Sequence, residues 1–251
     1  MREKLRYLMS RKSFHVCVMI VIISIIIFTF GLFILKYSVE GETNMPFNIT
    51  KITIISSSEG IDKESAENKW AFDINQNNDI FIYVDKNENY GKEEAIENIS
   101  IENINIQSQS DKGITNIYKP NSLDNENIFR NIQENLVEKI EYKGTMKSSL
   151  KNSEISNQGG IIAFRYAKDK IAEYFSNEET VNHNELLKKV NITEDELEAK
   201  ISFDIIINTQ LGKGYKANVS LNMPTEGILE NGKAYIEITK LEEIIFKRIK
   251  N

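Results

Sequence analysis

The loop at residues 85–91 (DKNENYG) carries oxygen-bearing side chains at alternate positions. The spacing D-x-N-x-N opens many calcium-binding loops, which makes Asp85, Asn87 and Asn89 candidate Ca²⁺ ligands. In such loops a glycine stands sixth and a bidentate glutamate twelfth, whereas here Gly91 is seventh and the glutamate is also displaced by one position. Asn and Asp are common turn residues as well. A weak calcium site and a plain turn are both open, and the turn is the simpler interpretation.

Two further segments match known active-site or binding-site sequence motifs only in part. Ser148 and Lys151 have the S-x-x-K spacing that places a lysine amine beside a serine hydroxyl, but the companion K-T-G is absent and no long apolar helix follows. Residues 227–233 (GILENGK) fit the phosphate-loop expression, but Ala234 replaces the Mg²⁺-binding Ser or Thr and a strand-like YIEIT follows. We interpret the first as a chance match and the second as a turn between strands.

Histidine and cysteine are scarce, which limits the chemistry that the chain offers. Among the two histidines, only His183 lies outside the apolar N-terminal run, and no serine is placed beside it as a Ser-His-Asp triad requires. The single cysteine, Cys17, excludes a disulfide scaffold and a thiolate zinc site. Because Cys17 lies inside the apolar run, it cannot act as a nucleophile on a substrate outside a bilayer. The residues therefore predict neither a catalytic site nor a cofactor.

An apolar run without formal charge extends over 22 residues, from Phe14 to Leu35. As a helix it spans about 33 Å, because an α-helix rises about 1.5 Å per residue, and the hydrocarbon core of a bilayer is about 30 Å thick. A cleaved signal peptide has an apolar region of about 7–15 residues and ends in small residues, whereas KYSVE follows here. The sequence predicts an uncleaved transmembrane helix (14–35) that contacts the lipid bilayer from Phe14 to Leu35.

Charge predicts the topology of this anchor. The first 13 residues hold five Lys or Arg and one Glu, and an excess of positive charge favours the cytoplasmic side. We therefore expect a cytoplasmic tail (1–13), a stalk (36–48) and an extracytoplasmic domain (49–251). Residues 37–251 carry a formal charge of −11, so the domain has no electrostatic reason to bind nucleic acid.

Beyond the stalk, alternation of apolar and polar residues is the dominant pattern. It predicts a hairpin of Ile201–Ile207 and Tyr215–Met223, because the Gly-rich segment between them suits a tight turn. It also predicts a second hairpin, in which Trp70–Ile74 and Ile80–Val84 are joined by a turn at Asn75–Asp79. Further strands are predicted at Lys51–Ser56, Ile99–Ile106, Ile114–Tyr118, Ile161–Tyr166, Ile171–Phe175, Tyr235–Thr239 and Ile244–Ile249.

Two stretches show helical signals instead. An apolar stripe behind Asp124 predicts a helix over 124–139; its members are Ile128, Phe129, Ile132, Leu136 and Val137. The spacing of Thr193 and Glu196 is a capping box that opens a short helical turn. Many short strands beside few helices favour a mainly β, antiparallel sandwich-like domain with one or two short helices. Whether a boundary near 121–140 divides it into two β lobes stays open.

Segments spread over nearly the whole chain resemble uncharacterised single-pass membrane proteins of clostridia-like low-GC Gram-positive bacteria. They include LKYSVEGETNMPFNITKITIISSSEG, NNDIFIYVDKN, SEISNQGGIIAFRY, NHNELLKKVNITEDELEAKISFD and IIFKRI. The resemblance implies a bacterial plasma-membrane location. Those proteins form an orphan family without an assigned activity, so the resemblance implies no site residue.

Together these patterns predict a membrane-anchored, non-catalytic extracytoplasmic module with an interaction or structural role in the bacterial cell envelope. Its expected partner is an envelope protein or a wall polymer. Two alternatives stay open. One is a carboxylate-based envelope hydrolase, since many acidic residues lie beyond the anchor. The other is a calcium- or ligand-binding sensor domain that uses Asp85, Asn87 and Asn89.

Overall fold

The computed structural model describes residues 12–39, 42–65, 67–121, 127–129 and 137–249. The chain divides into two compact units, Met1–Glu42 and Thr43–Asn251. The first unit contains helix α2 (Lys12–Val39), which includes the whole predicted transmembrane segment and extends beyond it at both ends.

Helix α2 is long and apolar enough to cross a membrane by length and composition. Between His15 and Leu32 none of its residues is buried inside the protein. Its one threonine, Thr29, donates its hydroxyl to the carbonyl oxygens of Ile25 and Ile26 at 2.9 Å each. That hydroxyl therefore needs no partner from outside the helix, as an apolar surrounding requires.

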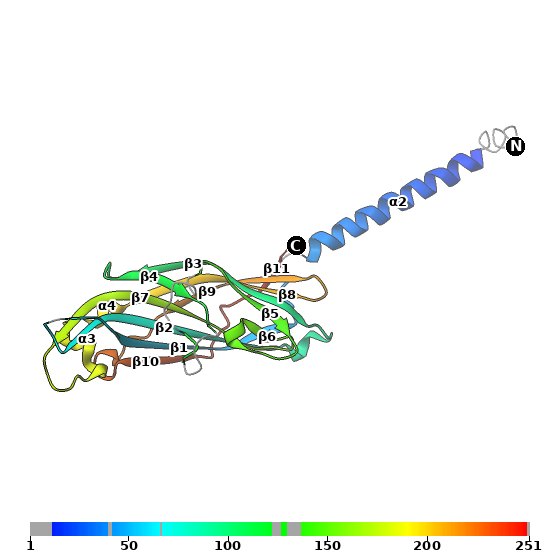
Figure 1. Cartoon of the computed structure of the whole chain (residues 1–251). Coiled ribbons are helices and arrows are strands. Elements are labelled where there is room, and N and C mark those ends of the chain that lie inside the picture. The colour runs from blue at the N-terminus through cyan, green and yellow to red at the C-terminus, as the bar shows by residue number, and fades with distance from the viewer. Residues whose placement is uncertain (1–11, 40–41, 66, 122–126, 130–136, 250–251) are drawn as a thin grey trace. The chain divides into compact units, whose positions relative to one another are not determined.

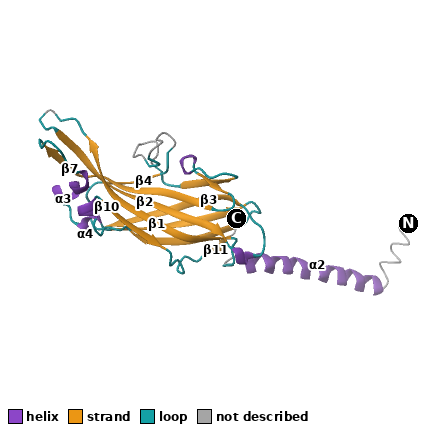
Figure 2. Cartoon of the chain, turned by 90° about the horizontal axis from the view of Figure 1, so that it is seen from below, coloured by secondary structure: helices purple, strands orange, loops and turns teal. Residues whose placement is uncertain are grey.

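Residues Thr43–Asn251 form a sandwich of two β-sheets (Figures 1 and 2). The strands of the first sheet, in spatial order, are β10 (Lys233–Ile238), β1 (Phe47–Asp62), β2 (Trp70–Lys86), β7 (Gly160–Ser176) and β4 (Ile114–Tyr118). Those of the second are β11 (Lys247–Ile249), β9 (Gly214–Asn222), β8 (Ala199–Thr209), β3 (Ile96–Ser108), β5 (Ile140–Thr145) and β6 (Glu154–Ser156). All pairings are antiparallel except β5–β6. The mainly β, sandwich-like fold predicted from alternation is confirmed.

The two sheets enclose the main hydrophobic core. At its centre the rings of Phe164 on β7 and Phe203 on β8 meet edge to face, with centroids 5.2 Å apart, and both side chains are fully buried. A second apolar cluster, which includes Phe72, Leu187 and Ile228, lies beneath short helices at one end of the sandwich. These helices are η4 (His183–Glu185), α3 (Leu186–Lys189), α4 (Glu194–Leu197) and α5 (Ile228–Asn231). Two further short helices, η1 (Glu88–Tyr90) and η3 (Leu150–Asn152), lie elsewhere in the sandwich.

The hairpin predicted at 201–223 is present as β8 and β9, and Gly212 in its turn has a positive φ of 72°. The predicted capping box is also present, because the backbone N–H of Thr193 donates to Glu196 Oε2 at 3.0 Å at the start of α4. Most of the predicted helix 124–139, Asp124 included, lies outside the described residues. The described residues 127–129 and 137–139 are not helical.

The second predicted hairpin is wrong. Residues 70–86 form one continuous strand, β2, which pairs along most of its length with β1 and β7. The segment read as a turn, Asn75–Asp79, runs through the sheet with only a bulge after Ile74. The two short strands predicted at 161–166 and 171–175 are likewise one strand, β7.

The outer face of the first sheet carries an ion pair between a buried arginine and a partly buried aspartate. Asp79 on β2 and Arg165 on β7 are direct neighbours in the ladder. The guanidinium group donates two hydrogen bonds to the carboxylate, from Nε to Oδ1 at 2.5 Å and from Nη2 to Oδ2 at 3.0 Å. It also donates to the carbonyl oxygen of Phe129 at 3.3 Å and lies over the Phe129 ring. Arg165 is only 4% exposed as a result.

Gly144 on β5 has no room for a side chain. A Cβ atom at this position would lie 2.1 Å from the carbonyl oxygen of Ile96 on the backbone of the neighbouring strand. We expect Gly144→Ala to lower the free energy of unfolding by about 3 kcal/mol, because the clash is with backbone that cannot move aside alone. Thermal melts of the detergent-solubilised chain would measure the loss.

The matched control for this prediction is Gly160→Ala. A Cβ there comes closest to the Ile155 side chain, at 3.3 Å, which can adjust, and lies at an ordinary contact distance of 3.7 Å from the backbone nitrogen of Ser156. A Gly144→Ala protein as stable as the Gly160→Ala protein would contradict the prediction.

Candidate functional site

The loop predicted as a weak calcium site lies where β2 ends, and its polar side chains hold the turn together. The Asp85 carboxylate accepts a hydrogen bond from the Thr50 hydroxyl at 2.6 Å. The Asn87 side chain accepts from the backbone N–H of Asn89 at 3.1 Å and donates to the Met45 carbonyl at 2.8 Å. These bonds fit the turn interpretation, and calcium binding stays a prediction. Within the described residues, no three His, Cys, Asp or Glu side chains are grouped as a metal site.

A polar cluster lies close behind this loop. Glu94 is 5% exposed, pairs with the Lys213 ammonium group and accepts a hydrogen bond from the Tyr90 hydroxyl at 3.0 Å. Burial alone would raise the pKa of Glu94, but hydrogen bonds from Lys213, Thr209 and Tyr90 outweigh it and lower that pKa. Glu94 therefore carries its charge at neutral pH and ties the loop to the β8–β9 hairpin.

This cluster predicts a loss of stability in acid. A carboxyl group whose pKa is lowered by folding stabilises the folded state above its unfolded pKa of 4.5, and the contribution disappears as the pH falls through the lowered value. We expect the fall in melting temperature between about pH 6 and about pH 3 to be smaller in Glu94→Gln than in the parent. Fluorescence of Trp70, the only tryptophan, would report the melts.

The exposed neighbour supplies the control, because Glu93→Gln removes the same charge without touching the Lys213 pair. Equal acid sensitivity in the parent and in Glu94→Gln would refute the assignment to Glu94.

The segment misread as a turn forms a polar layer inside the sandwich. Along β2 and β7, polar residues separate the main core from the second apolar cluster. Asn78 accepts from the Ser56 hydroxyl at 2.6 Å and donates to the Tyr166 carbonyl at 3.3 Å. Gln76 donates to the Leu197 carbonyl at 3.0 Å. We call the inward residues of this region the polar layer: Ser56, Gln76, Asn78, Ser108, Tyr166 and Lys168.

Lys168 is the charged member of the polar layer and joins the two sheets. It is 2% exposed, and its ammonium group donates to Ser108 Oγ at 2.8 Å and to the Ser110 carbonyl at 2.6 Å. Burial lowers the pKa of Lys168, and the charges of Asp111 and Glu196 offset that effect in part. A serine nucleophile with a lysine base uses such a pair.

The surroundings of this pair favour a structural role. The Ser108 hydroxyl is itself within hydrogen-bond distance of the Ser110 carbonyl, at 3.1 Å, which is the carbonyl that Lys168 also contacts. The three groups thus close a small network that holds the end of β3 against β7. We therefore interpret Lys168 as a positioning residue for the β3 end.

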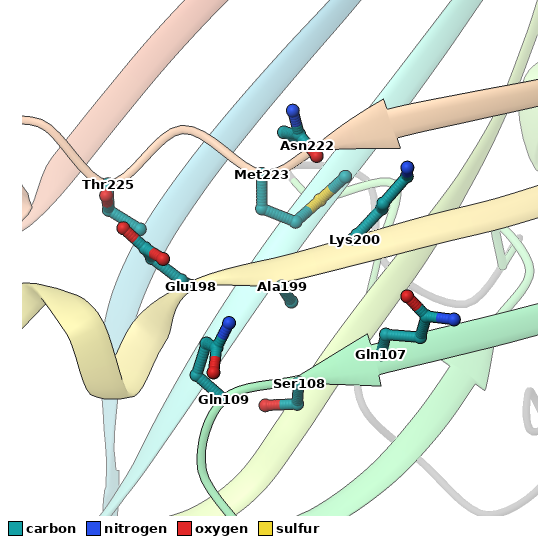
Figure 3. Close-up of a pocket in the computed structure, with 9 residues that line it drawn as sticks. All are labelled: Gln107, Ser108, Gln109, Glu198, Ala199, Lys200, Asn222, Met223 and Thr225. Carbon is teal, nitrogen blue, oxygen red and sulfur yellow. The ribbon is translucent and has the colours of Figure 1, made fainter.

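A cavity of about 430 Å³ opens beside Ser108. Its walls come from the end of β3, the start of β8 and the segment after β9 (Figure 3). The lining is mostly polar and includes one acidic and one basic side chain; its members are Gln107, Ser108, Gln109, Glu198, Ala199, Lys200, Asn222, Met223 and Thr225. Sequence reasoning missed both this cavity and the polar layer behind it.

Of the remaining sequence candidates in the β-sandwich, two are neighbours, because η4, which begins at His183, contacts α5 within residues 227–233. His183 packs its ring against Phe72, with centroids 5.1 Å apart. Cys17 is exposed on α2. Lys151 lies in η3, the short helix that Ser149 precedes. Residues 227–233 contain the four-residue helix α5 between two glycines of positive φ, followed by β10.

Strand β10 gives the first sheet an exposed edge (Figure 1). It pairs with β1 on one side, with Ile54 opposite Ile236 and Ile55 opposite Tyr235. Tyr235 is 61% and Ile236 is 40% exposed. On the outer face the Tyr235 hydroxyl donates to Glu237 at 3.0 Å, and Lys51 pairs with the same carboxylate at 3.2 Å.

The three other sheet edges are less available. Strands β6 and β11 have only three residues each, and short edge strands offer little to a pairing strand. At β4 the carbonyl oxygen of Ile117 already accepts a hydrogen bond from the backbone of Val137 at 3.0 Å. Among the described edge strands, β10 is the longest, with six residues.

No family model, no curated protein and no solved structure matches this chain. An assignment of function must therefore come from the chain's own residues. The features that stand out are the exposed apolar helix α2, the polar layer and the open edge of β10.

Proposed function

We propose that this chain is a membrane-anchored, non-catalytic interaction module of the bacterial cell envelope. In this proposal α2 crosses the plasma membrane with its N-terminus in the cytoplasm, and the β-sandwich lies outside. The sandwich binds a partner by strand addition at β10. The observation that carries the proposal is the open β10 edge with its two exposed apolar side chains, Tyr235 and Ile236. Backbone pairing at such an edge supplies affinity, and side chains on alternate faces supply specificity.

The carboxylate-hydrolase alternative receives less support. A glycosidase-like acid needs a carboxyl group whose pKa is raised. Among the described residues, every carboxyl group with a displaced pKa has it lowered. Although burial opposes the effect, hydrogen bonds, chiefly from lysine ammonium groups, dominate at these positions: Asp73, Glu94, Glu102, Glu196, Asp204 and Glu237.

The test replaces Tyr235 by proline in the full-length chain. The N–H of residue 235 points away from β1, as shown below, so proline removes an edge donor and leaves the β1–β10 hydrogen bonds in place. After solubilisation of native membranes in mild detergent, we expect a stoichiometric partner with the parent chain and its loss with Tyr235→Pro.

Tyr235→Thr is the matched control, because it removes the aromatic ring but keeps the N–H and a residue that favours strands. Strand addition predicts that Tyr235→Thr retains more partner than Tyr235→Pro. A partner that Tyr235→Pro retains in full would overturn the use of β10.

A further inference from the structure

We propose that the strand added at β10 is the β10 of a second copy of this chain, paired antiparallel about Tyr235. This inference rests on the proposed use of the β10 edge and names its partner. The pair would be an isologous dimer, in which the same residues of both copies meet across a two-fold axis.

The direction of the backbone groups on β10 follows from one hydrogen bond. The N–H of Ser58 donates to the carbonyl of Gly232 at 3.0 Å, so these two residues form a hydrogen-bonded pair in the β1–β10 ladder. In an antiparallel ladder such pairs alternate, and Ala234 and Ile236 therefore bond to β1. The N–H and C=O groups of Lys233, Tyr235 and Glu237 consequently point outward, toward a partner strand.

Charge selects the register. An antiparallel pair of β10 strands centred on Tyr235 places Lys233 of each copy opposite Glu237 of the other, and opposite charges across strands are favourable. A register centred on Ile236 places Glu237 opposite Tyr235 and makes no such charge pair. A parallel pair in register brings Lys233 beside Lys233, which is unfavourable.

The same register also suits the directions of the backbone groups on β10 and the sizes of its side chains. In this register Lys233 forms a hydrogen-bonded pair with Glu237 of the other copy, and the two Tyr235 residues pair with each other. The backbone N–H and C=O groups of all three residues point outward, as these pairs require. On the outer face the two Tyr235 rings become cross-strand neighbours, an aromatic pair that stabilises sheets. On the inner face the exposed Ile236 of one copy lies opposite Ala234 of the other, where the small side chain leaves room.

A common membrane would strengthen so short an interface. Two copies anchored in one bilayer meet at a far higher effective concentration than free domains do. Pairing also closes the edge, because each β10 then has a neighbour on both sides and no further strand can add there.

Cysteine cross-linking in native membranes tests the register directly. The full chain carries Cys17→Ser, so that the helix cannot cross-link. In the proposed dimer the two Cα atoms of residue 235 lie about 5.5 Å apart, within the range that a disulfide spans. We expect Tyr235→Cys to form a dimer under mild oxidation. Lys233→Cys alone and Glu237→Cys alone should form no cross-linked dimer, because in each case the same residue of the other copy lies about 13 Å away. Coexpression of the Lys233→Cys and Glu237→Cys chains should form a cross-linked dimer.

Charge exchange supplies the second measurement. Lys233→Glu alone and Glu237→Lys alone should each lower the Tyr235→Cys cross-linked fraction by about tenfold. The double exchange, Lys233→Glu with Glu237→Lys, should restore part of it, because the pair across the two copies returns while Lys51 loses its carboxylate partner within the chain. Lys188→Glu, an equal charge change at an exposed position of helix α3, is the control and should have no effect.

The outcomes separate the two proposals. Tyr235→Cys without a dimer, while Tyr235→Pro still releases a different stoichiometric protein, overturns self-pairing and leaves the interaction module standing. Cross-linking that is equal at residues 233, 235 and 237 overturns the register. Absence of both the dimer and any partner sensitive to Tyr235→Pro overturns self-pairing and the use of β10 together.

Discussion

Replacing Asp79 by alanine is expected to lower the free energy of unfolding by about 3–5 kcal/mol, because it removes a carboxylate that accepts two charge-assisted hydrogen bonds from a buried guanidinium group. Arg165 is 4% exposed and makes two of its hydrogen bonds to this carboxylate. Urea unfolding followed by Trp70 fluorescence would measure the change.

A double variant shows whether the loss comes from the buried guanidinium charge that Asp79→Ala leaves in place. Asp79→Leu with Arg165→Met replaces the ion pair by apolar side chains and is expected to be more stable than Asp79→Ala. If the double variant is the less stable of the two, the ion pair stabilises the fold by more than apolar side chains of similar size can.

Phe203→Ala is expected to cost about 3–5 kcal/mol, because it opens a cavity where the two sheets meet. The ring of Phe203 contacts that of Phe164 edge to face, so the substitution removes apolar contacts from both sheets at once. The measurement is again chemical unfolding of the solubilised chain.

Phe203→Leu retains most of the apolar volume and should cost clearly less. A similar loss for the alanine and leucine variants would point to the ring geometry, and not the cavity, as the source of the stability.

One-sided alternation made the β8–β9 hairpin predictable. Its apolar residues, apart from Ile206, fall on one face, and its Gly-rich turn is local in sequence. The same reasoning failed at Asn75–Asp79, since polar residues there were assigned to a turn. The segment contains neither Gly nor Pro, which was the one local sign that the strand continues. Its hydrogen-bond partners, among them Ser56, Tyr166 and Leu197, are remote in sequence and invisible to any local pattern.

In the candidate site, too, the local elements could be predicted from the sequence and their long-range contacts could not. The strand at β10 was predicted, but its position at an edge depends on pairing between residues near 54 and residues near 236, and sequence periodicity carries no strand order. The link between Lys168 and Ser108 likewise joins residues 60 positions apart. Periodicity therefore identified the elements, and tertiary contacts decided which of them are exposed.

The pairing of β1 with β10 also sets when the sandwich can be completed. Ile52 on β1 pairs with Ile238 on β10. The outer edge of β1, the first strand to be synthesised, is therefore covered only after β10, the last strand but one, has been synthesised. At about 5–20 residues per second, synthesis of the intervening chain takes roughly 10–40 s. During that time β1 has an open edge, which makes the nascent chain prone to mispairing. A chain that stops before β10 would keep that open edge permanently, and we expect cells to remove it as an unfinished product.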